Sequence, residues 1–145
     1  MAGSATAELA GAVSNSGGFG MLGMGSTVPD PERLEFQIKR MRDITANPFG
    51  VGFITSVDGI DSLVELAIEN EVDLIGHSFS DPSPYVPDAK KAGIKVLAQV
   101  QTVKQAVHAR DSGVDLLVAQ GTDGGGHTGH IGTISIVPAV VDACP

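Results

Sequence analysis

Cysteine is nearly absent from this sequence, in which Cys144 is the single one among 145 residues. One cysteine excludes an internal disulfide and a metal cage built from thiolates, which fits a reducing compartment. Basic residues are also few, since 9 Lys and Arg stand against 17 Asp and Glu and the net charge is −8. Nucleic-acid binders carry a basic face and anionic membranes attract clusters of Lys and Arg, so we expect neither partner.

Long apolar runs and targeting signals are missing too. No apolar stretch approaches the roughly 18 residues that span a bilayer. The N-terminal stretch MAGSATAELAGAVSNSGG has neither the positive charge typical of a signal peptide nor the arginines of a transit peptide. We therefore expect a cytoplasmic protein with no membrane contact, folded as a single domain over residues 1–145.

The sequence does contain a regular alternation of short apolar runs with amphipathic segments. The predicted strands are 19–25, 48–55, 72–79, 94–100 and 114–121. The predicted helices are 30–45, 59–71, 84–93, 102–113 and a further one from Thr133. Strands separated by single helices form a parallel sheet, either open and doubly wound or closed as an eight-stranded barrel. Both architectures bind ligands at the carboxyl ends of their strands.

Small and polar residues occupy those carboxyl ends, as in a pocket for a flat ligand with polar edges. Gln99, Gln101 and Gln120 lie there, and buried amides must form hydrogen bonds, either with a ligand or with neighbouring loops. For His77, a place in the same pocket and a structural role both stay open. His108 is expected on a helix surface.

The most unusual stretch is AQGTDGGGHTGH, from Ala119 to His130, which has five glycines and two histidines. It matches neither a Walker loop nor a G-x-G-x-x-G motif, so it predicts either a plain turn or a close approach of backbone to ligand. His127 could move protons there, since histidine is a common general acid and base, or it could be an exposed loop residue. His130 and Asp123 could bind a metal, but glycines disfavour the helix this needs, so no metal is expected.

Four segments resemble the nitronate monooxygenases, formerly called 2-nitropropane dioxygenases, in their order and spacing. They are MAGSATAELAGAVSNSGGFGMLG, PFGVGFI, AGIKVLAQVQTVKQA and GVDLLVAQGTDGGGHTG. The resemblance covers nearly the whole chain, and the last segment is its most specific part. It implies an α/β fold of the (β/α)8 (TIM) barrel type, a flavoprotein that uses FMN, and oxidation of alkyl nitronates by O₂ to a carbonyl compound and nitrite.

The resemblance also implies the roles of particular residues. His127 matches the catalytic histidine, an acid and base. Gln120 matches the glutamine that binds the flavin, and Gly125 with the adjoining Gly126 matches the glycines beside the flavin. Met1 and Ala2 resemble the end of the family's first strand, where backbone would contact the cofactor.

Three departures from the family pattern stand out. Gly52 occupies a position where the family often has an asparagine that contacts FMN, and the usual EAGGH reads DGGGH from Asp123 to His127. The third departure is the length, because a complete barrel needs roughly 200–250 residues or more and this chain has 145. We therefore expect an incomplete barrel of about five β/α units, truncated at both ends. Its open sheet edges predict marginal stability or assembly with a partner, of which a homo-oligomer is one form, and weak retention of FMN.

Two other functions stay open. The flavin-dependent enoyl-[acyl-carrier-protein] reductases share motifs of the types AVSNGGGLG, PFGVN and EAGGH, and they need NAD(P)H and an enoyl thioester. The run VLAQVQTV favours the monooxygenases over these reductases. The third reading is an inactive flavin-binding fragment.

Overall fold

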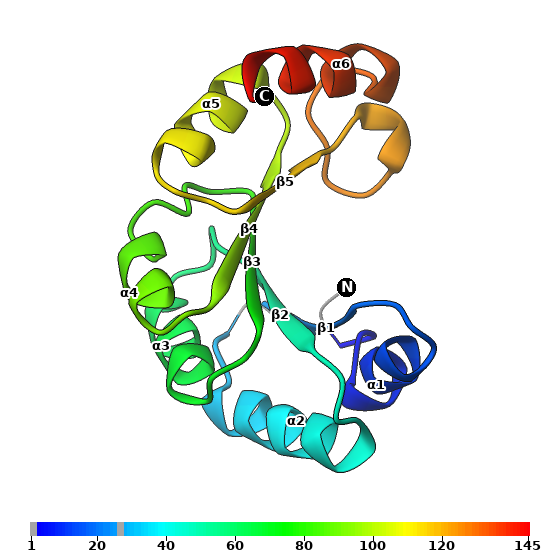
Figure 1. The fold of residues 1–145 in the computed structure, drawn as a ribbon, viewed down its shortest axis with the longest axis vertical. Helices are drawn as coiled ribbons and strands as arrows, with labels where there is room; N and C mark the ends of the chain where they lie inside the picture. Colours follow the sequence, from blue (N-terminus) through cyan, green and yellow to red (C-terminus); the bar gives the residue numbers. More distant parts are fainter. Residues whose placement is uncertain (1–2, 26–27) are drawn as a thin grey trace.

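The strands pair in chain order into one curved parallel sheet (Figure 1). The computed structural model describes residues 3–25 and 28–145. The strands are β1 (Gly20–Met24), β2 (Phe49–Ile54), β3 (Leu74–Ser78), β4 (Lys95–Val100) and β5 (Leu116–Ala119). Each pairs in parallel with the next, so all five carboxyl ends meet at one edge of the sheet. The five predicted strands are confirmed.

The helices lie on the convex side of this sheet. They are α1 (Ala7–Asn15), α2 (Pro31–Ile44), α3 (Asp61–Glu69), α4 (Val86–Lys91), α5 (Val103–Asp111) and α6 (Thr133–Ala143), with a short 3₁₀ helix η1 (Thr122–Gly124). Figure 1 shows α2 to α5 along the outside of the arc, with α1 and α6 at its two ends. Sequential strand order with helices on one side is the arrangement of a (β/α)8 barrel, not of a doubly wound sheet. Over the described residues the barrel is incomplete.

Local signals explain where the helices begin. The Asp30 side chain accepts a hydrogen bond from the backbone N–H of Arg33 at 3.0 Å, and Pro31 fills the first position of α2. Thr102 caps α5 in the same way, accepting from the N–H of Gln105 at 3.1 Å. The predicted C-terminal helix is confirmed as α6, which continues through Pro138.

Alternate strand residues pack outward against the helices and form the core. Leu22, Val51, Phe53, Ile75 and Val96 are buried in this way. The sheet's other face is concave and carries the intervening residues. Three of these are glycines that lie side by side, because Gly23 pairs with Gly52 and Gly52 with Gly76. The glycine row adds no side chains to this face, and the Met21 side chain lies against Gly76, where a Cβ would be 3.0 Å from Met21 Cε.

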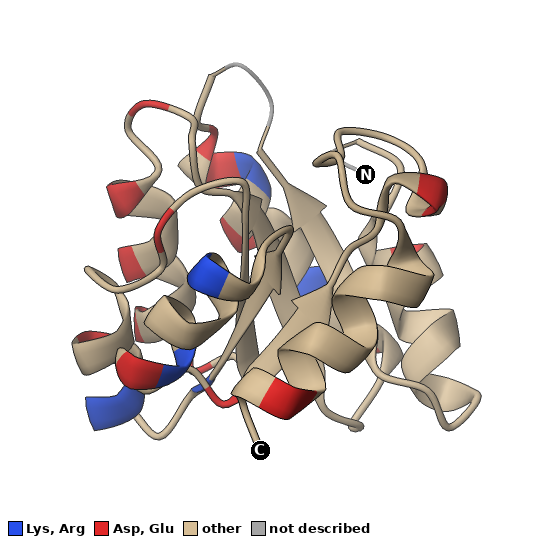
Figure 2. Ribbon diagram, turned by 90° about the horizontal axis from the view of Figure 1, so that it is seen from above, with Lys and Arg blue, Asp and Glu red and all other residues tan. Residues whose placement is uncertain are grey.

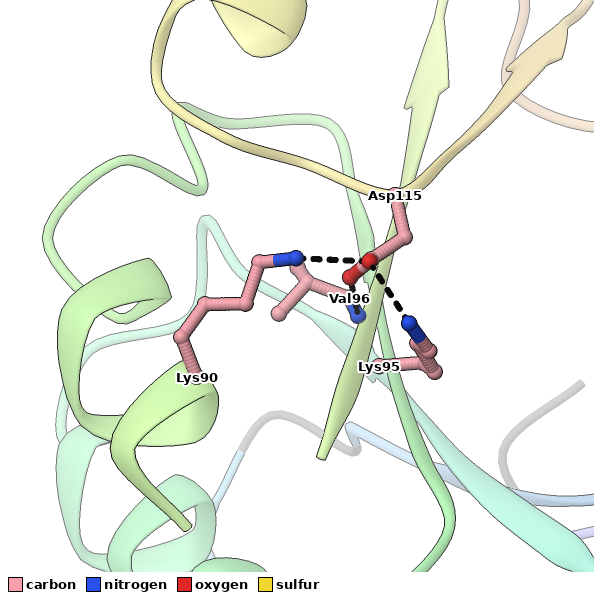
Figure 3. A network of polar contacts seen from close by, with 4 residues as sticks. All are labelled: Lys90, Lys95, Val96 and Asp115. Carbon is pink, nitrogen blue, oxygen red and sulfur yellow. Dashed lines mark hydrogen bonds and ion pairs between the residues drawn. The ribbon is translucent and has the colours of Figure 1, made fainter. Parts of the chain in front are cut away.

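A repeated Val-Asp-Leu motif ties two strands to the strands that precede them. The Asp73 carboxylate accepts a hydrogen bond from the N–H of Phe49, and the Asp115 carboxylate accepts one from the N–H of Val96, both at 2.9 Å. Lys90 and Lys95 also donate to Asp115, at 2.6 and 3.2 Å (Figure 3). Burial opposes ionisation of Asp115, but these donors outweigh it and lower its pKa to about 2.

Charged residues are spread over the outside of the molecule. Figure 2 shows Asp and Glu on several helices and connecting segments, with fewer Lys and Arg among them. Within the part of the chain that the structure describes, no helix combines the length and apolar character that crossing a membrane requires.

The two ends of the sheet are its open edges. Among the described residues, β5 pairs only with β4, and the outer edge of β1 meets only a short segment at Ala5, whose carbonyl accepts from the N–H of Gly23 at 2.9 Å. Apolar side chains are exposed beside the β5 edge, including Val118 on the strand and Ile134 on α6. Unpaired parallel edges flanked by apolar surface favour association.

We predict that the 145-residue chain self-associates as its concentration rises, and that Val118→Lys shifts it toward monomer. Val118 is 44% exposed on the edge strand, where a charge opposes strand pairing. Sedimentation velocity over a concentration series measures this. Phe36→Lys on α2 is the control, because Phe36 is 63% exposed but lies on a helix and not on an edge strand. A monomer at every concentration, or equal effects of the two variants, would contradict the prediction.

Candidate active site

A cavity of about 600 Å³ lies at the carboxyl edge of the sheet. Residues of β1, β2, β3 and β4 line it, among them Gly23, Gly52 and Gln99, together with Ala5, Phe79 and residues that follow β5. Its volume falls within the roughly 300–1,000 Å³ that is typical of cofactor and ligand sites.

Four of the residues singled out from the sequence come together here. Gln120, Gly125, Gly126 and His127 all line this one cavity. Met1 and Ala2, which were also predicted to contact the cofactor, lie outside the described residues. The structure thus places the predicted histidine and glutamine around a common space.

Two glutamine amides hold the glycine loop, which we define as residues 121–132, in its place. Gln101 Nε2 donates to Gln120 Oε1 at 2.9 Å and to the His127 carbonyl at 3.2 Å. Gln120 Nε2 donates to the Gly125 carbonyl at 3.3 Å. For these two residues, the amides pair with each other and with the loop, while Gln120 Nε2 keeps one more proton to donate to a ligand.

Glycine is required in this loop for two different reasons. Gly125 and Gly126 have φ values of 73° and 71°, in the left-handed region that side chains disfavour. Gly121 is required by close approach, since a Cβ there would lie 2.2 Å from the backbone nitrogen of Thr133. The glycines therefore let the chain turn back over the cavity and let α6 begin directly beside β5.

His127 presents an exposed imidazole at the mouth of the cavity. Its ring meets the edge of Phe79 in a T-shaped contact, with centroids 5.8 Å apart. Its ring nitrogens form no hydrogen bond or ion pair with the residues that the structure describes. Both nitrogens are therefore available to a ligand as donor or acceptor.

Asp123 has a structural partner. Its Oδ1 accepts a hydrogen bond from the N–H of Thr133 at 2.8 Å, at the first turn of α6, and hydrogen bonding to Thr133 lowers the pKa of Asp123. His130 is exposed. Over residues 3–25 and 28–145, no three His, Cys, Asp or Glu side chains gather as a metal site would need.

The cavity fits the flat, polar-edged group that a flavin presents. Gly23 and Gly52 add no side chain of their own to its wall, and a Cβ at Gly52 would meet only ordinary contacts, Met21 Cε at 3.5 Å and the Leu22 carbonyl at 3.7 Å. The Gln99 side chain lines the cavity and forms no hydrogen bond with the described residues. Two glycines and apolar side chains beside a free amide group suit an aromatic ring with donors and acceptors at its rim.

His77 belongs to the core and does not line this cavity. It is 1% exposed, stacks on Tyr85 with centroids 5.0 Å apart, and forms a 2.9 Å hydrogen bond between Nδ1 and Thr55 Oγ1. Its Nε2 is the one buried side-chain polar atom without a partner in the part of the chain that the structure describes. Burial lowers the pKa of His77 to about 4, so the ring is neutral at physiological pH.

Comparison with known proteins identifies the family of this chain. A family model described as nitronate monooxygenase matches residues 1–61 and 52–145. The chain belongs to the nitronate monooxygenase family. Nothing in the match assigns a role to an individual residue, so the roles of His127, Gln120, Gly125 and Gly126 stay predictions.

Curated relatives resemble the chain over almost all of its length. A Mycobacterium tuberculosis protein named (3aS,4S,5R,7aS)-5-hydroxy-7a-methyl-1-oxo-octahydro-1H-indene-4-carboxyl-CoA dehydrogenase is 31% identical over 139 residues, 96% of this chain and 39% of the relative. A probable nitronate monooxygenase of Staphylococcus aureus is 30% identical over 188 positions, 98% of this chain and 52% of the relative. The chain thus spans about half the length of such relatives, or less.

Solved structures confirm the incomplete barrel. A mutant of FabK from Thermotoga maritima superposes with a TM-score of 0.95 and 34% identity, over 99% of this chain and 48% of that one. The nitroalkane oxidase of Streptomyces ansochromogenes superposes with a TM-score of 0.90 and 25% identity, over 99% and 54%. Both are TIM barrels.

Phe79 lines the cavity but is not one of the site residues predicted from the sequence. It contacts His127 and has a φ of 67°. In the sequence it is an apolar residue at the end of a predicted strand. No local signal marks an aromatic residue for a left-handed conformation, because that conformation depends on tertiary contacts.

We predict that His77 makes the stability of this chain fall as the pH is lowered from 6.5. The unfolded histidine has a pKa near 6.5 and the folded one near 4, so the unfolded state binds more protons between these values. The stabilising contribution is complete above pH 6.5 and is lost as pH falls toward 4. Between pH 6.5 and 5 the free energy of unfolding should drop by roughly 1.5 kcal/mol.

Urea unfolding at several pH values measures this effect, and His77→Phe should remove it. His108→Gln is the control, because His108 is exposed and bonds to Asp81 at 3.0 Å. If His77→Phe keeps the full wild-type slope between pH 6.5 and 5, the buried imidazole does not cause it.

Proposed function

We propose that this chain forms the catalytic half of an FMN-dependent oxidoreductase that oxidises alkyl nitronates with O₂ to a carbonyl compound and nitrite. The observation that carries the proposal is the single cavity that Gln120, Gly125, Gly126 and His127 share. The family match and the likeness to a nitroalkane oxidase support it.

Residues of this chain would hold the flavin along one side of the cavity. Gln120 Nε2 and the free Gln99 amide offer hydrogen bonds to its polar edge, and backbone at Gly125 and Gly126 can approach closely because no side chain intervenes. Gly23 and Gly52 leave room for a planar ring. When bound, the flavin supplies the redox chemistry with O₂.

His127 would act on the substrate. A nitronate is an anion with a planar carbon–nitrogen group, and a protonated imidazole offers it a positively charged donor. A neutral imidazole could instead accept the α-proton of a nitroalkane and so generate the nitronate. The free ring nitrogens of His127 at the cavity mouth suit both roles.

We predict that His127→Asn loses most activity on neutral nitroalkanes, roughly 100-fold or more in kcat/KM, and much less on preformed nitronates. Only the nitroalkane needs its proton removed. Oxygen consumption with nitroethane and with its nitronate measures the two reactions. His130→Asn is the matched control, because His130 is an exposed histidine of the same loop. Equal losses on both substrates would refute a role as base.

We predict that Gly52→Asn strengthens FMN binding about fivefold, by about 1 kcal/mol from one added hydrogen bond. The site has room for a Cβ at this position, and the resemblance implies that an asparagine here contacts FMN. Quenching of flavin fluorescence during titration measures the dissociation constant. Gly52→Ala adds the Cβ without the amide and should leave affinity unchanged. Equal affinities of the asparagine and alanine variants would exclude the contact.

A second candidate function is reduction of an enoyl thioester, as in the flavin-dependent enoyl-[acyl-carrier-protein] reductases. The likeness to FabK and to a dehydrogenase named for a CoA substrate favours it. The alignment with the Staphylococcus aureus protein extends over 188 positions, whereas this chain has 145 residues. The Staphylococcus protein therefore contains internal residues that this chain lacks. Anaerobic oxidation of NADH in the presence of crotonyl-CoA, without turnover of nitronates, would select this function. Flavin binding without either activity would select the inactive module.

A further inference from the structure

Phe79 has a left-handed backbone conformation, which an aromatic residue rarely adopts. Among the described residues, Glu71 and Phe79 are the two non-glycine residues with positive φ, at 48° and 67°. Glu71 follows the end of α3, where its N–H donates to the Ile68 carbonyl and terminates the helix. Phe79 follows a strand and ends no helix. An aromatic residue keeps this conformation only when its surroundings impose it.

The left-handed turn begins where β3 loses its regular pairing. His77 faces the core, and the Ser78 carbonyl still accepts from the N–H of Thr55 at 3.0 Å, which continues the sheet by one step. Strict alternation would then return residue 79 to the helix side. Instead, the Phe79 ring reaches the loop over the cavity, as its T-shaped contact with His127 shows.

Phe79 is the side chain against which the His127 imidazole rests. The imidazole follows two glycines whose Cβ positions have no heavy atom within 4 Å, so packing of the preceding loop residues does not orient it. The Gln101 amide holds the backbone carbonyl of His127 but not its ring. The aromatic contact of the imidazole among the described residues is with Phe79, at a centroid distance of 5.8 Å.

The same pair lies between two cavities. Phe79 and His127 line the 600 Å³ cavity and also a neighbouring one of about 360 Å³, which Ser56 and Thr128 help to line. An imidazole at this junction borders both cavities. Its direction there decides whether a proton can be transferred.

We propose that Phe79 is a positioning residue, whose ring, aimed by the left-handed backbone, orients the His127 imidazole toward the cavity. The inference rests on the proposed function only for what His127 does once it is oriented. The orientation itself belongs to this chain and can be measured without flavin or substrate.

The first experiment is an NMR measurement on the 145-residue chain without cofactor. The ring of Phe79 shifts the Cε1–H signal of His127, which is identified by its loss in His127→Asn. Phe79→Leu keeps an apolar side chain and the same backbone cost but removes the ring, so the signal should move toward the position of free histidine. Phe79→Tyr should keep it in place. Phe36→Leu on α2 is the matched control and should leave it unchanged.

The second experiment uses the flavin-loaded protein. Phe79→Leu should lower kcat on a neutral nitroalkane roughly tenfold, with KM within about twofold, and should affect the nitronate less. Phe79→Tyr should restore the wild-type rate. If the His127 signal does not move in Phe79→Leu, the positioning role is overturned. It is also overturned if the signal moves but kcat stays at the wild-type value, provided that His127→Asn has lost activity. Absence of all nitroalkane activity would instead refute the proposed function, and the NMR result would still decide the orientation.

Discussion

The hydrogen bond between the side chains of Gln101 and Gln120 determines where the glycine loop lies. These residues follow neighbouring strands, and parallel pairing brings the ends of β4 and β5 together, so their amides meet at 2.9 Å. The remaining donors of the pair hold the carbonyls of Gly125 and His127. They act together with the bond from the N–H of Thr122 to the Ile131 carbonyl, at 2.9 Å, to fix the path of a loop that contains two left-handed glycines.

The curvature of the sheet supplies the space that this loop covers. Outward residues such as Val51 and Ile75 pack under the helices, while the concave face carries the row of Gly23, Gly52 and Gly76. Core stability and ligand space therefore come from opposite faces of the same strands. The two histidines follow this division, since His77 is buried among core residues and His127 stands over the cavity.

The open edges have a consequence for how such a half barrel can work. A closed barrel has no unpaired strand, whereas among the described residues β5 pairs only with β4 and apolar residues of α6 are exposed beside it. Residues of β1 to β4 and of the loop after β5 line the candidate site. The exposed Val118 and Ile134 at the β5 edge are not among them.

The sequence by itself determined the alternation of strands and helices, the caps at Asp30 and Thr102, and the grouping of Gln120 and His127 at one edge, because local hydrophobic period and chain order control these features. Only the tertiary structure decided that His77 faces the core, that Asp123 caps α6, and that Phe79 turns toward His127. A residue at the end of a strand can continue the alternation or leave it. That choice depends on contacts with β2, α4 and the distant loop, which no short stretch of sequence contains.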